Sequence, residues 1–581
     1  MASFPISTRR HSAAHVLAAA VLQMFPEAKL GTGPDTDTGF YYDFQLPRPL
    51  IPEDLEILQK KMEDIAKKQI PFERFEEPVE KAKAFLEKIG QTFKVELVEK
   101  FQKEQGITTV SFYKNGDVFV DLCEGPHVEH TGQIGAFALT HFSGAYWQGD
   151  ANREQMTRIY GLCFATPKEL KKYQQMLEEA KKRDHRKLGQ ELDLFTFSPL
   201  VGSGLPLFTP KGTFIREKIA STIQEMQAEY GFEKVNIPHI TKKELYEKSG
   251  HWQKFKDDLF HVHGKSDAEF VMKPMNCPHH AQIFASKMRS YRDLPLRYAE
   301  VTTCYRDEQQ GELLGLSRVR SLTQDDGHIF CRVQQIKQEA KNIVAVIRAF
   351  YSKLGMFQKG EYWVSLSVRD PKTPEKYLGD SKHWEEAERF LHEIAEEEQL
   401  EYKRVEGEAA FYGPKLDFLF RDAIGREWQL ATIQIDFVQP ERFELEYINE
   451  HGEKERPVMI HRAIAGSLER FMSVIIEHFA GAFPAWLAPV QAHILPIADA
   501  HQEYAETIAK RLKENGGRGE VIPASESLGK RIREGQMLKI PFLLVVGDTE
   551  VNEHTVAVRR YGEKRQESMS MEECIAHICN E

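Results

Sequence analysis

"LRYAEVTTCYRDEQQGELLGLSRVRSLTQDDGHIFC", residues 296–331, contains two runs of strand-forming residues on either side of a polar loop with several glycines. This pattern predicts two antiparallel strands joined as a hairpin. Arg306 and Arg318 flank the loop. A guanidinium is planar, permanently charged and able to bind in bidentate fashion, so the two arginines suit a phosphate group. A structural hairpin whose arginines are simply solvated explains this segment equally well.

Two segments on either side of this hairpin carry further signals. "IHRAIAGSLERFMSVIIEHFAG" (residues 460–481) predicts a strand end that runs into an otherwise apolar helix, in which an inward-facing Arg470 would need a partner. "EYGFEKVNIPHI" (residues 229–240) predicts a helix end, a turn and a strand interrupted by Pro238. The chain has no GxxxxGK[ST] loop, no GxGxxG fingerprint and no HExxH helix, so a nucleotide site would need another chemistry.

The composition predicts a cytoplasmic globular protein. Its 581 residues are enough for about three or four domains, and no apolar run approaches the roughly 18 residues that span a membrane. The N-terminal apolar run contains histidines and no clear cleavage site, so we expect no signal peptide. The seven cysteines occur singly, which favours a reducing compartment over a disulfide framework. Because the net charge is -11, nucleic-acid binding would need local basic patches.

Changes in composition divide the chain. Residues 166–190 are rich in charge and predict a helix that joins two domains, although an ordinary surface helix fits this segment equally well. A mixed region precedes it (1–165), and a long α+β region follows (191–483). Residues 484–581 alternate strand, helix and strand, which predicts a small α/β domain. We therefore expect an α+β multidomain protein.

Several motifs carry a resemblance to a known family. The order "GFEKVNIP", "YRDE…RVR" and "GSLERF" resembles the three signature motifs of class II aminoacyl-tRNA synthetases. "MKPMNCPHH", "TQDDGHIFC", "FYGPKLDF", "WQLATIQIDF" and "HRAIAGSLERF" are similar to the catalytic core of threonyl-tRNA synthetases, and the resemblance covers nearly the whole chain. It implies an antiparallel-sheet catalytic core, an N-terminal α+β editing domain and a C-terminal α/β anticodon-binding domain.

The resemblance implies ATP-dependent ligation of L-threonine to tRNA(Thr) through threonyl-adenylate. Arg306 would bind the α-phosphate of ATP and Glu308 the adenine, while Arg318 and Arg470 would bind the outer phosphates or stack on the adenine. Adenylate formation needs neutralisation of charge more than proton transfer, which arginines and Mg²⁺ bound with ATP can supply. Pro238 would lie at the interface of a homodimer formed through the catalytic domain.

The resemblance also implies a zinc ion bound by Cys277, His328 and His461. Three protein ligands leave a coordination position for substrate, as in catalytic zinc sites. Without the resemblance, the two histidines would be interpreted as hydrogen-bonded polar residues, because their long-range spacing has no metal-binding pattern.

Zinc would give the site its selectivity. Threonine and valine have nearly the same shape, and an apolar pocket separates such isosteres only about a hundredfold. Zinc can bind the amino and hydroxyl groups of threonine, and valine lacks the hydroxyl. The resemblance adds Asp326 as partner of the hydroxyl, and Gln324, Tyr412 and Gln429 as residues that hold the amino acid and the polar parts of the adenylate.

Serine differs from threonine only by the absence of a methyl group, so the zinc site would admit some serine. A second, hydrolytic site is therefore needed to remove it. A methyl group is worth about 1–3 kcal/mol of discrimination, a limit known from other synthetases. "STRRHSAAHVLAAAVLQMF" (residues 7–25) predicts a helix capped by Ser7 or Thr8, with His11 and His15 on one face. Downstream, "FVDLCEGPHVEHTG" adds more polar and metal-binding side chains.

Three interpretations of these N-terminal residues remain open from the residues alone. They are a histidine pair packed on a core face, a zinc site, and a metal-free pocket in which histidines position water and the 3′ end of tRNA. The resemblance to the editing domain shared by threonyl- and alanyl-tRNA synthetases favours the third. It implies hydrolysis of seryl-tRNA(Thr) by His11, His15, Lys94, Asp121, Cys123 and His127.

The C-terminal region resembles an anticodon-binding domain. Arginine and carboxylate side chains read base edges, and single-stranded loops expose those edges. Arg533, Glu550 and Arg559 are the candidates, although without the resemblance each would be interpreted as a solvated surface residue.

The sequence departs from the family in two places. His11 comes so early that we expect the small ubiquitin-like domain found in many relatives to be missing, and Leu430-Ala431 stands where the family has cysteine and glycine. Three other functions remain as alternatives: a class II synthetase for another amino acid, a catalytically inactive RNA-binding paralogue, and a stand-alone tRNA deacylase.

Overall fold

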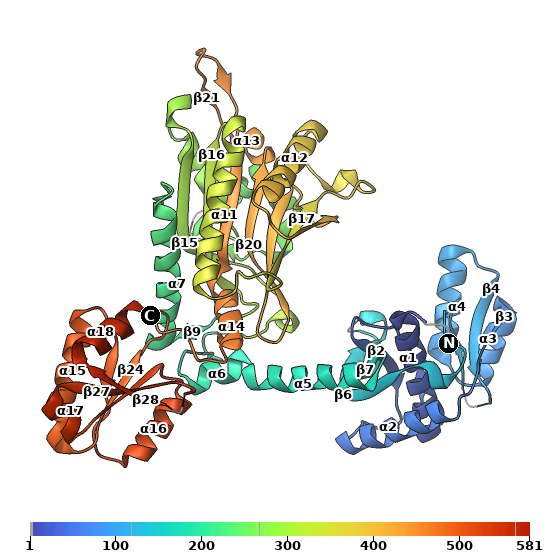
Figure 1. Ribbon diagram of the computed structural model, residues 1–581. Coiled ribbons are helices and arrows are strands. Elements are labelled where there is room, and N and C mark those ends of the chain that lie inside the picture. Colours follow the sequence, from blue (N-terminus) through green and yellow to red (C-terminus); the bar gives the residue numbers. More distant parts are fainter. Residues whose placement is uncertain (1–3, 118, 151, 266–267, 564) are drawn as a thin grey trace. The chain divides into compact units, whose positions relative to one another are not determined.

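The computed structural model describes residues 4–117, 119–150, 152–265, 268–563 and 565–581. The chain divides into two compact units, Met1–Glu178 and Glu179–Glu581 (Figure 1). Each unit has its own hydrophobic core. None of the described helices combines the length and apolar character needed to cross a membrane.

The N-terminal unit is built on a four-stranded antiparallel sheet in the order β1-β2-β7-β6, with two helices packed against it. These elements are β1 (Lys29–Leu30), β2 (Gly39–Gln45), β6 (Ala136–Tyr146), β7 (Gln155–Phe164), α1 (Ile6–Met24) and α2 (Pro52–Lys67). Helix α1 begins at Ile6 without a side-chain cap, so the predicted caps at Ser7 and Thr8 are wrong. Both residues lie inside the first turn instead.

A second, three-stranded sheet completes this unit in the order β3-β4-β5. Its elements and the two helices beside it are β3 (Phe72–Pro78), β4 (Thr109–Asn115), β5 (Phe119–Leu122), α3 (Val79–Lys88) and α4 (Thr92–Gln105). Strand β5 ends one residue before Cys123, whose Sγ lies 3.0 Å from His11 of α1, and Lys94 of α4 pairs with Asp121 of β5.

An eight-stranded sheet forms the centre of the second unit, in the order β10-β15-β16-β23-β20-β19-β17-β18. Its strands are β10 (Glu233–Lys234), β15 (Leu296–Tyr305), β16 (Ser321–Cys331), β17 (Tyr362–Val368), β18 (Tyr402–Glu406), β19 (Lys415–Arg421), β20 (Glu427–Asp436) and β23 (Val458–Ser467). All neighbours are antiparallel except the two outermost pairs. Strands β15 and β16 pair antiparallel, which confirms the predicted hairpin.

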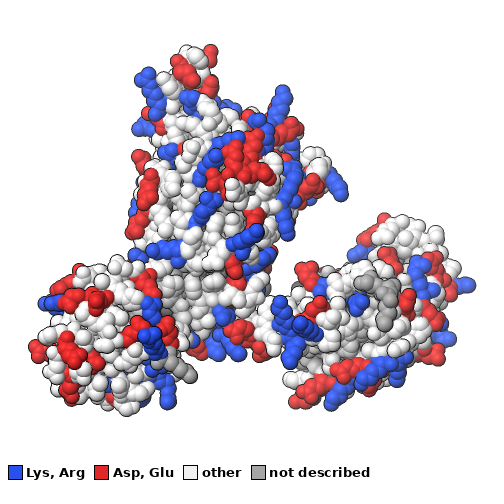
Figure 2. All heavy atoms as spheres, in the orientation of Figure 1, with Lys and Arg blue, Asp and Glu red and all other residues white. Residues whose placement is uncertain are grey.

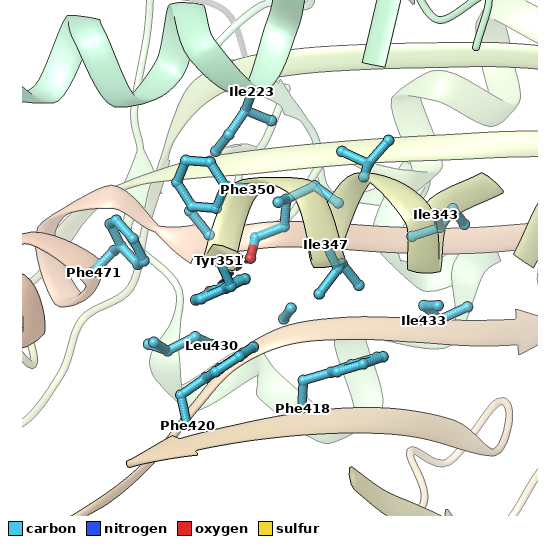
Figure 3. Close-up of a cluster of buried hydrophobic side chains, with 14 of the residues drawn as sticks. Ile223, Ile343, Ile347, Phe350, Tyr351, Phe418, Phe420, Leu430, Ile433 and Phe471 are labelled. Atoms are coloured by element: carbon cyan, nitrogen blue, oxygen red, sulfur yellow. Dashed lines mark hydrogen bonds between the residues drawn. The ribbon is translucent and has the colours of Figure 1, made fainter. Parts of the chain in front are cut away.

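The helices of this unit bury one face of the sheet. They include α7 (Pro210–Ala228), α11 (Ile336–Lys353), α12 (Ser381–Glu397) and α14 (Leu468–His478). Figure 3 shows Tyr351 of α11 over Phe420 of the sheet, and their ring centroids lie 3.7 Å apart. The Tyr351 hydroxyl also donates to the Ile464 carbonyl at 2.9 Å, which ties α11 to the strand that leads into α14.

The C-terminal region forms a five-stranded sheet in the order β25-β24-β26-β27-β28. Its elements are β24 (Ala492–Pro496), β25 (Gly519–Val521), β26 (Phe542–Val546), β27 (Thr555–Arg560), β28 (Gln566–Ser570), α15 (Gln502–Glu514), α16 (Leu528–Met537), α17 (Asp548–Glu553) and α18 (Met571–Asn580). The first three strands are parallel and the last two antiparallel, so the predicted α/β domain is confirmed.

The segment predicted as a linker helix forms two helices, α5 (Pro167–Arg183) and α6 (His185–Glu191). They are separated at Asp184, whose side chain accepts a hydrogen bond from the Arg186 backbone and caps α6. None of the residues of α5 is buried, and the boundary between the two units falls within it.

Candidate functional site

Cys277, His328 and His461 lie together in the centre of the second unit. Cys277 begins α10 (Cys277–Ala285), and the two histidines face each other across the paired strands β16 and β23. Their possible ligand atoms all lie within 4.8 Å of one another. Strand pairing thus joins residues that are far apart in sequence.

The partners of the two imidazoles suit a metal centre. His461 Nε2 lies 2.8 Å from Oδ2 of the buried Asp436, and His328 Nδ1 lies 2.7 Å from His280 Nδ1. Each ring therefore has one nitrogen in a hydrogen bond and the other available as a ligand. Metal-binding histidines characteristically bond a carboxylate through their second nitrogen, as His461 does.

Burial sets the protonation of this cluster. It raises the pKa of the Cys277 thiol well above its ordinary value and lowers the pKa of His328 well below its own. The neutral imidazole of His328 is ready to bind a cation, and a thiol in the position of Cys277 needs one in order to ionise. The set of one sulfur and two nitrogens therefore fits Zn²⁺ with a coordination position left for substrate.

Two of the predicted threonine-binding residues border this cluster. The Asn276 amide donates to Asp326 Oδ2 at 2.9 Å, and the other carboxylate oxygen lies 3.7 Å from His328 Nε2. The Tyr412 ring lies 5.3 Å from that of His461. The remaining two, Gln324 and Gln429, line a neighbouring cavity.

That neighbouring cavity has a volume of about 530 Å³ and is lined by all four residues predicted to bind ATP. Its charged and amide lining residues include Arg306, Glu308, Arg318, Gln324, Gln429 and Arg470. Arg318 donates to Glu308 at 2.7 Å, and Leu430, one of the two positions that depart from the family, also lines the cavity. The concentration of arginines in one hollow suits a polyphosphate.

Sequence reasoning missed His251 in this region. Its side chain is buried, its Nδ1 lies 2.8 Å from Ser249 Oγ, and its Nε2 has no partner among the described residues. The ring lies 5.7 Å from that of Tyr412, and burial lowers the pKa of His251 to about 3. A lone histidine in a loop has no spacing pattern, so nothing in the sequence identified it.

The six predicted editing residues also lie close together, in the N-terminal unit. Cys123 Sγ lies 3.0 Å from His11 Nε2 and 3.3 Å from His127 Nε2. Lys94 forms a buried ion pair with Asp121 at 2.8 Å. A cavity of about 810 Å³ is lined by five of the six, His11, His15, Lys94, Asp121 and Cys123.

The chemistry of this pocket is that of neutral groups around one buried ion pair. Burial raises the pKa of Cys123 to about 11 and lowers the pKa of His127 to about 3. At neutral pH, the thiol is therefore protonated and the imidazole is uncharged, which suits the positioning of water. The zinc interpretation stays open, because four side chains here have possible ligand atoms close enough together to bind one metal ion: His11, His15, Cys123 and His127.

The three candidate anticodon residues come from different elements of the C-terminal sheet domain. Arg533 is exposed on α16. Glu550 accepts a hydrogen bond from the Gly547 backbone at 2.8 Å and so helps to begin α17. Arg559, on β27, donates to the Glu563 carbonyl at 3.2 Å. Figure 2 shows charges of both signs interspersed on the visible face, so RNA binding there would depend on local groups.

Comparison with known families agrees with this arrangement. The tRNA synthetase class II core domain (G, H, P, S and T) matches residues 260–479, and the anticodon binding domain matches residues 491–581. The threonyl and alanyl tRNA synthetase second additional domain matches residues 110–160. These matches confirm the predicted fold class.

Individual relatives are similar over nearly the whole chain. The threonine--tRNA ligase of Gloeobacter violaceus is 50% identical, with 98% of this chain and 91% of that protein covered. A threonine--tRNA ligase of Thermus thermophilus is 48% identical, with 95% of this chain and 85% of that protein covered.

Solved structures share the fold. The RNA binding domain of threonyl-tRNA synthetase from Cryptosporidium parvum superposes with a TM-score of 0.64 at 35% identity, covering 68% of this chain and 98% of that one. Prolyl-tRNA synthetase from Giardia lamblia has a TM-score of 0.55 at 17% identity, covering 70% and 79%, which is a likeness of fold alone. Since threonine--tRNA ligases match this sequence from end to end at close to half of all positions, the chain belongs to the threonyl-tRNA synthetase family.

Proposed function

We propose that this protein activates L-threonine with ATP and transfers it to tRNA(Thr), and that its N-terminal unit hydrolyses seryl-tRNA(Thr). The observation that carries the first activity is the meeting of Cys277, His328 and His461 beside a cavity lined with arginines. This observation makes the three alternatives poorer explanations: a class II synthetase for another amino acid, an inactive RNA-binding paralogue and a stand-alone deacylase.

In the proposed activation step, the chain binds and orients threonine and ATP and neutralises the charge of the phosphates. Zinc held by the three ligands would supply a Lewis acid that recognises the amino and hydroxyl groups of threonine. Asp326 accepts the hydrogen of that hydroxyl, and Tyr412 closes the pocket beside His461. Arg306 neutralises the α-phosphate, and Arg318 and Arg470 stabilise the departing pyrophosphate, to which Mg²⁺ bound with ATP would add positive charge.

The test of this activity is Cys277→Ser, with Cys574→Ser as the matched control, because Cys574 is a buried thiol in α18. We expect Cys277→Ser to lose its zinc and its threonine-dependent ATP–pyrophosphate exchange, and the control to keep both. The wild type is expected to exclude valine and to admit some serine. A zinc-free Cys277→Ser enzyme with full activity would contradict the assignment.

The editing proposal rests on the Cys123 cluster and the Lys94–Asp121 ion pair in one cavity. Lys94 and Asp121 are proposed to bind the charged end of seryl-tRNA, and the imidazoles to position water. We expect Cys123→Ala and His11→Ala to lose most deacylation of seryl-tRNA(Thr), and His141→Ala, an exposed histidine on β6, to retain it. Metal analysis of the wild type tests whether this pocket works without an ion, and unchanged deacylation in both variants would remove the proposal.

We also propose the domain bounds 1–165, 166–190, 191–483 and 484–581. The family matches support these bounds and the anticodon contacts. The free cysteines of the described chain support a location in the cytoplasm. We also propose a homodimer through the catalytic domain, with the segment around Pro238 at its interface, where Ile240 is 47% exposed. Sedimentation equilibrium of Ile240→Asp, expected to weaken the dimer, tests this contact.

A further inference from the structure

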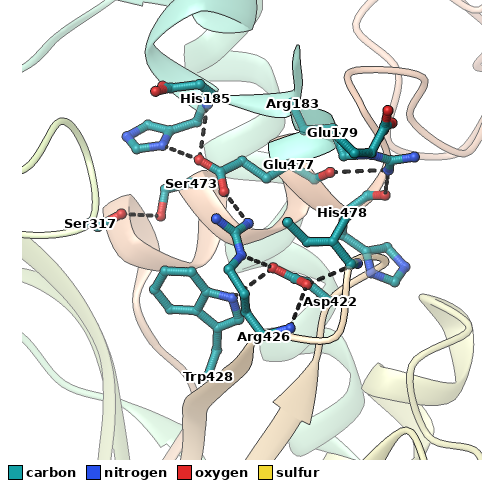
Figure 4. A network of polar contacts seen from close by, with 12 residues as sticks. Glu179, Arg183, His185, Ser317, Asp422, Arg426, Trp428, Ser473, Glu477 and His478 are labelled. Carbon is teal, nitrogen blue, oxygen red and sulfur yellow. Dashed lines mark hydrogen bonds and ion pairs between the residues drawn. The ribbon is translucent and has the colours of Figure 1, made fainter. Parts of the chain in front are cut away.

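A buried pair outside the proposed ATP cavity joins α6 to the helix that carries Arg470. His185 is 3% exposed at the start of α6, and Glu477 is 7% exposed near the end of α14. Glu477 Oε1 accepts a hydrogen bond from the His185 backbone at 3.0 Å and lies 2.6 Å from its Nδ1 (Figure 4). Two contacts to one oxygen fix both the backbone and the ring of His185.

The second nitrogen of His185 holds the loop of the predicted hairpin. The Leu316 backbone donates to His185 Nε2 at 3.0 Å. A nitrogen that accepts carries no hydrogen, so the hydrogen of the neutral ring is on Nδ1 and is donated to Glu477. The imidazole therefore donates to a helix on one side and accepts from a loop on the other.

The loop approaches this ring closely. Gly315 has a φ of +49°, and a Cβ built on it would lie 2.2 Å from His185 Nε2. Leu316 is fully buried, and Ser317 Oγ lies 2.9 Å from Ser473 Oγ on α14. The next residue is Arg318, which lines the cavity. His185 and Ser473 therefore fix the two residues that immediately precede Arg318 in the loop.

The other oxygen of Glu477 connects, through a series of contacts, to Arg470, which also lines the cavity. Glu477 Oε2 contacts Arg426, whose Nε donates to Asp422 at 2.7 Å. Asp422 also accepts from the Trp428 indole at 3.0 Å, and the guanidinium of Arg470 lies 5.8 Å from the centroid of the Trp428 ring. Burial tends to raise the pKa of Glu477, but hydrogen bonds from His185 and Arg426 lower it overall, so the carboxylate is charged.

We propose that His185 and Glu477 are positioning residues for ATP, which hold in place two arginines that line the cavity, Arg318 and Arg470. Neither is among the residues that line the cavity, so they act through the loop and through Trp428. By distance, Asp184, His185 and Glu477 could also hold a metal ion, but both nitrogens of His185 are already in hydrogen bonds. The inference rests on the proposed binding of ATP in this cavity.

The first test is His185→Asn. The amide of asparagine can replace Nδ1 as a donor to Glu477, but it is too short to accept from the Leu316 backbone. Because a buried backbone N–H then loses its partner, we expect the KM for ATP in pyrophosphate exchange to rise about tenfold. The KM for threonine and the zinc content are expected to remain unchanged. His392→Asn, an exposed histidine of α12, is the matched control.

A second variant covers the case in which His185→Asn does not fold. Ser473→Ala leaves His185 intact and removes the hydroxyl that contacts Ser317 and that donates to the Arg470 carbonyl within α14, so we expect a rise of about threefold in the KM for ATP. Calorimetric titration with ATP–Mg²⁺ measures the same loss at equilibrium. If the wild type binds ATP but fails to activate threonine, the proposed function fails while this inference remains testable by binding. Wild-type ATP affinity in His185→Asn, or in Ser473→Ala where the first variant does not fold, overturns the inference.

Discussion

At the scale of single residues, Asp436 orients one ligand of the proposed zinc site. Its Oδ1 accepts from the Val438 backbone at 2.7 Å and its Oδ2 faces His461, so the carboxylate is itself fixed. We expect Asp436→Ala to weaken zinc binding about 10–100-fold, as loss of such partners does in other sites. Competition with a chromophoric chelator measures this, with exposed Asp499→Ala as the control. Equal zinc affinity in the two variants would show that Asp436 has no role in orienting His461.

A buried histidine in the C-terminal domain predicts a dependence of stability on pH. Burial lowers the pKa of His493 from its ordinary 6.5 to about 4. Between these two values the unfolded chain binds more protons than the folded one, so the free energy of unfolding falls as pH drops from 6.5 toward 4. The slope from this residue is at most about 1.4 kcal/mol per pH unit.

Urea denaturation at a series of pH values checks this expectation. We expect His493→Gln to have a flatter profile than the wild type between pH 6.5 and about 4. Parallel profiles for the two proteins would mean that His493 is not the group responsible.

Individual site residues could not be placed from the residues alone. Cys277, His328 and His461 have no local spacing, and only the resemblance to the family joined them before strand pairing did. His251 and Glu477 had no signal at all, because their importance comes from partners distant in sequence. Burial and hydrogen-bond partners are properties of the fold, which a single sequence does not state.

At the scale of elements, the predictions that succeeded had strong local patterns. The hairpin of β15 and β16 and the strands β24, β26 and β27 follow from runs of β-branched and apolar residues. The predicted start of α1 was wrong because a cap depends on whether the side chain reaches a free backbone N–H. The continuous charge pattern across residues 166–190 likewise concealed the break at Asp184.

The contact between α11 and the central sheet predicts a stability change. Tyr351→Phe keeps the ring that stacks on Phe420 but removes the hydrogen bond to the Ile464 carbonyl. Because the volume is nearly unchanged, we expect a loss of about 1 kcal/mol in the free energy of unfolding. Ile347→Ala, which opens a cavity in the same cluster, is expected to cost about 2–5 kcal/mol. If the Tyr351→Phe protein is as stable as the wild type, this hydrogen bond does not contribute to the stability of the core.

At the scale of the whole molecule, the chain has two units with separate cores. Two independent cores predict two calorimetric unfolding transitions. If zinc binds at Cys277, it stabilises only the unit that contains that residue, so chelation is expected to lower the midpoint of one transition by several degrees and leave the other in place. Equal shifts of both transitions would mean that the units unfold as one, or that metal binds in both.

The contact between Gly315 and His185 also has a consequence for how such proteins diverge. The two positions share one small volume, since a single added carbon at 315 would overlap the imidazole. A side chain at 315 is therefore tolerated only alongside a smaller residue at 185, although a long stretch of chain separates the two positions. Across lineages, we expect position 315 to depart from glycine only where position 185 is no longer histidine.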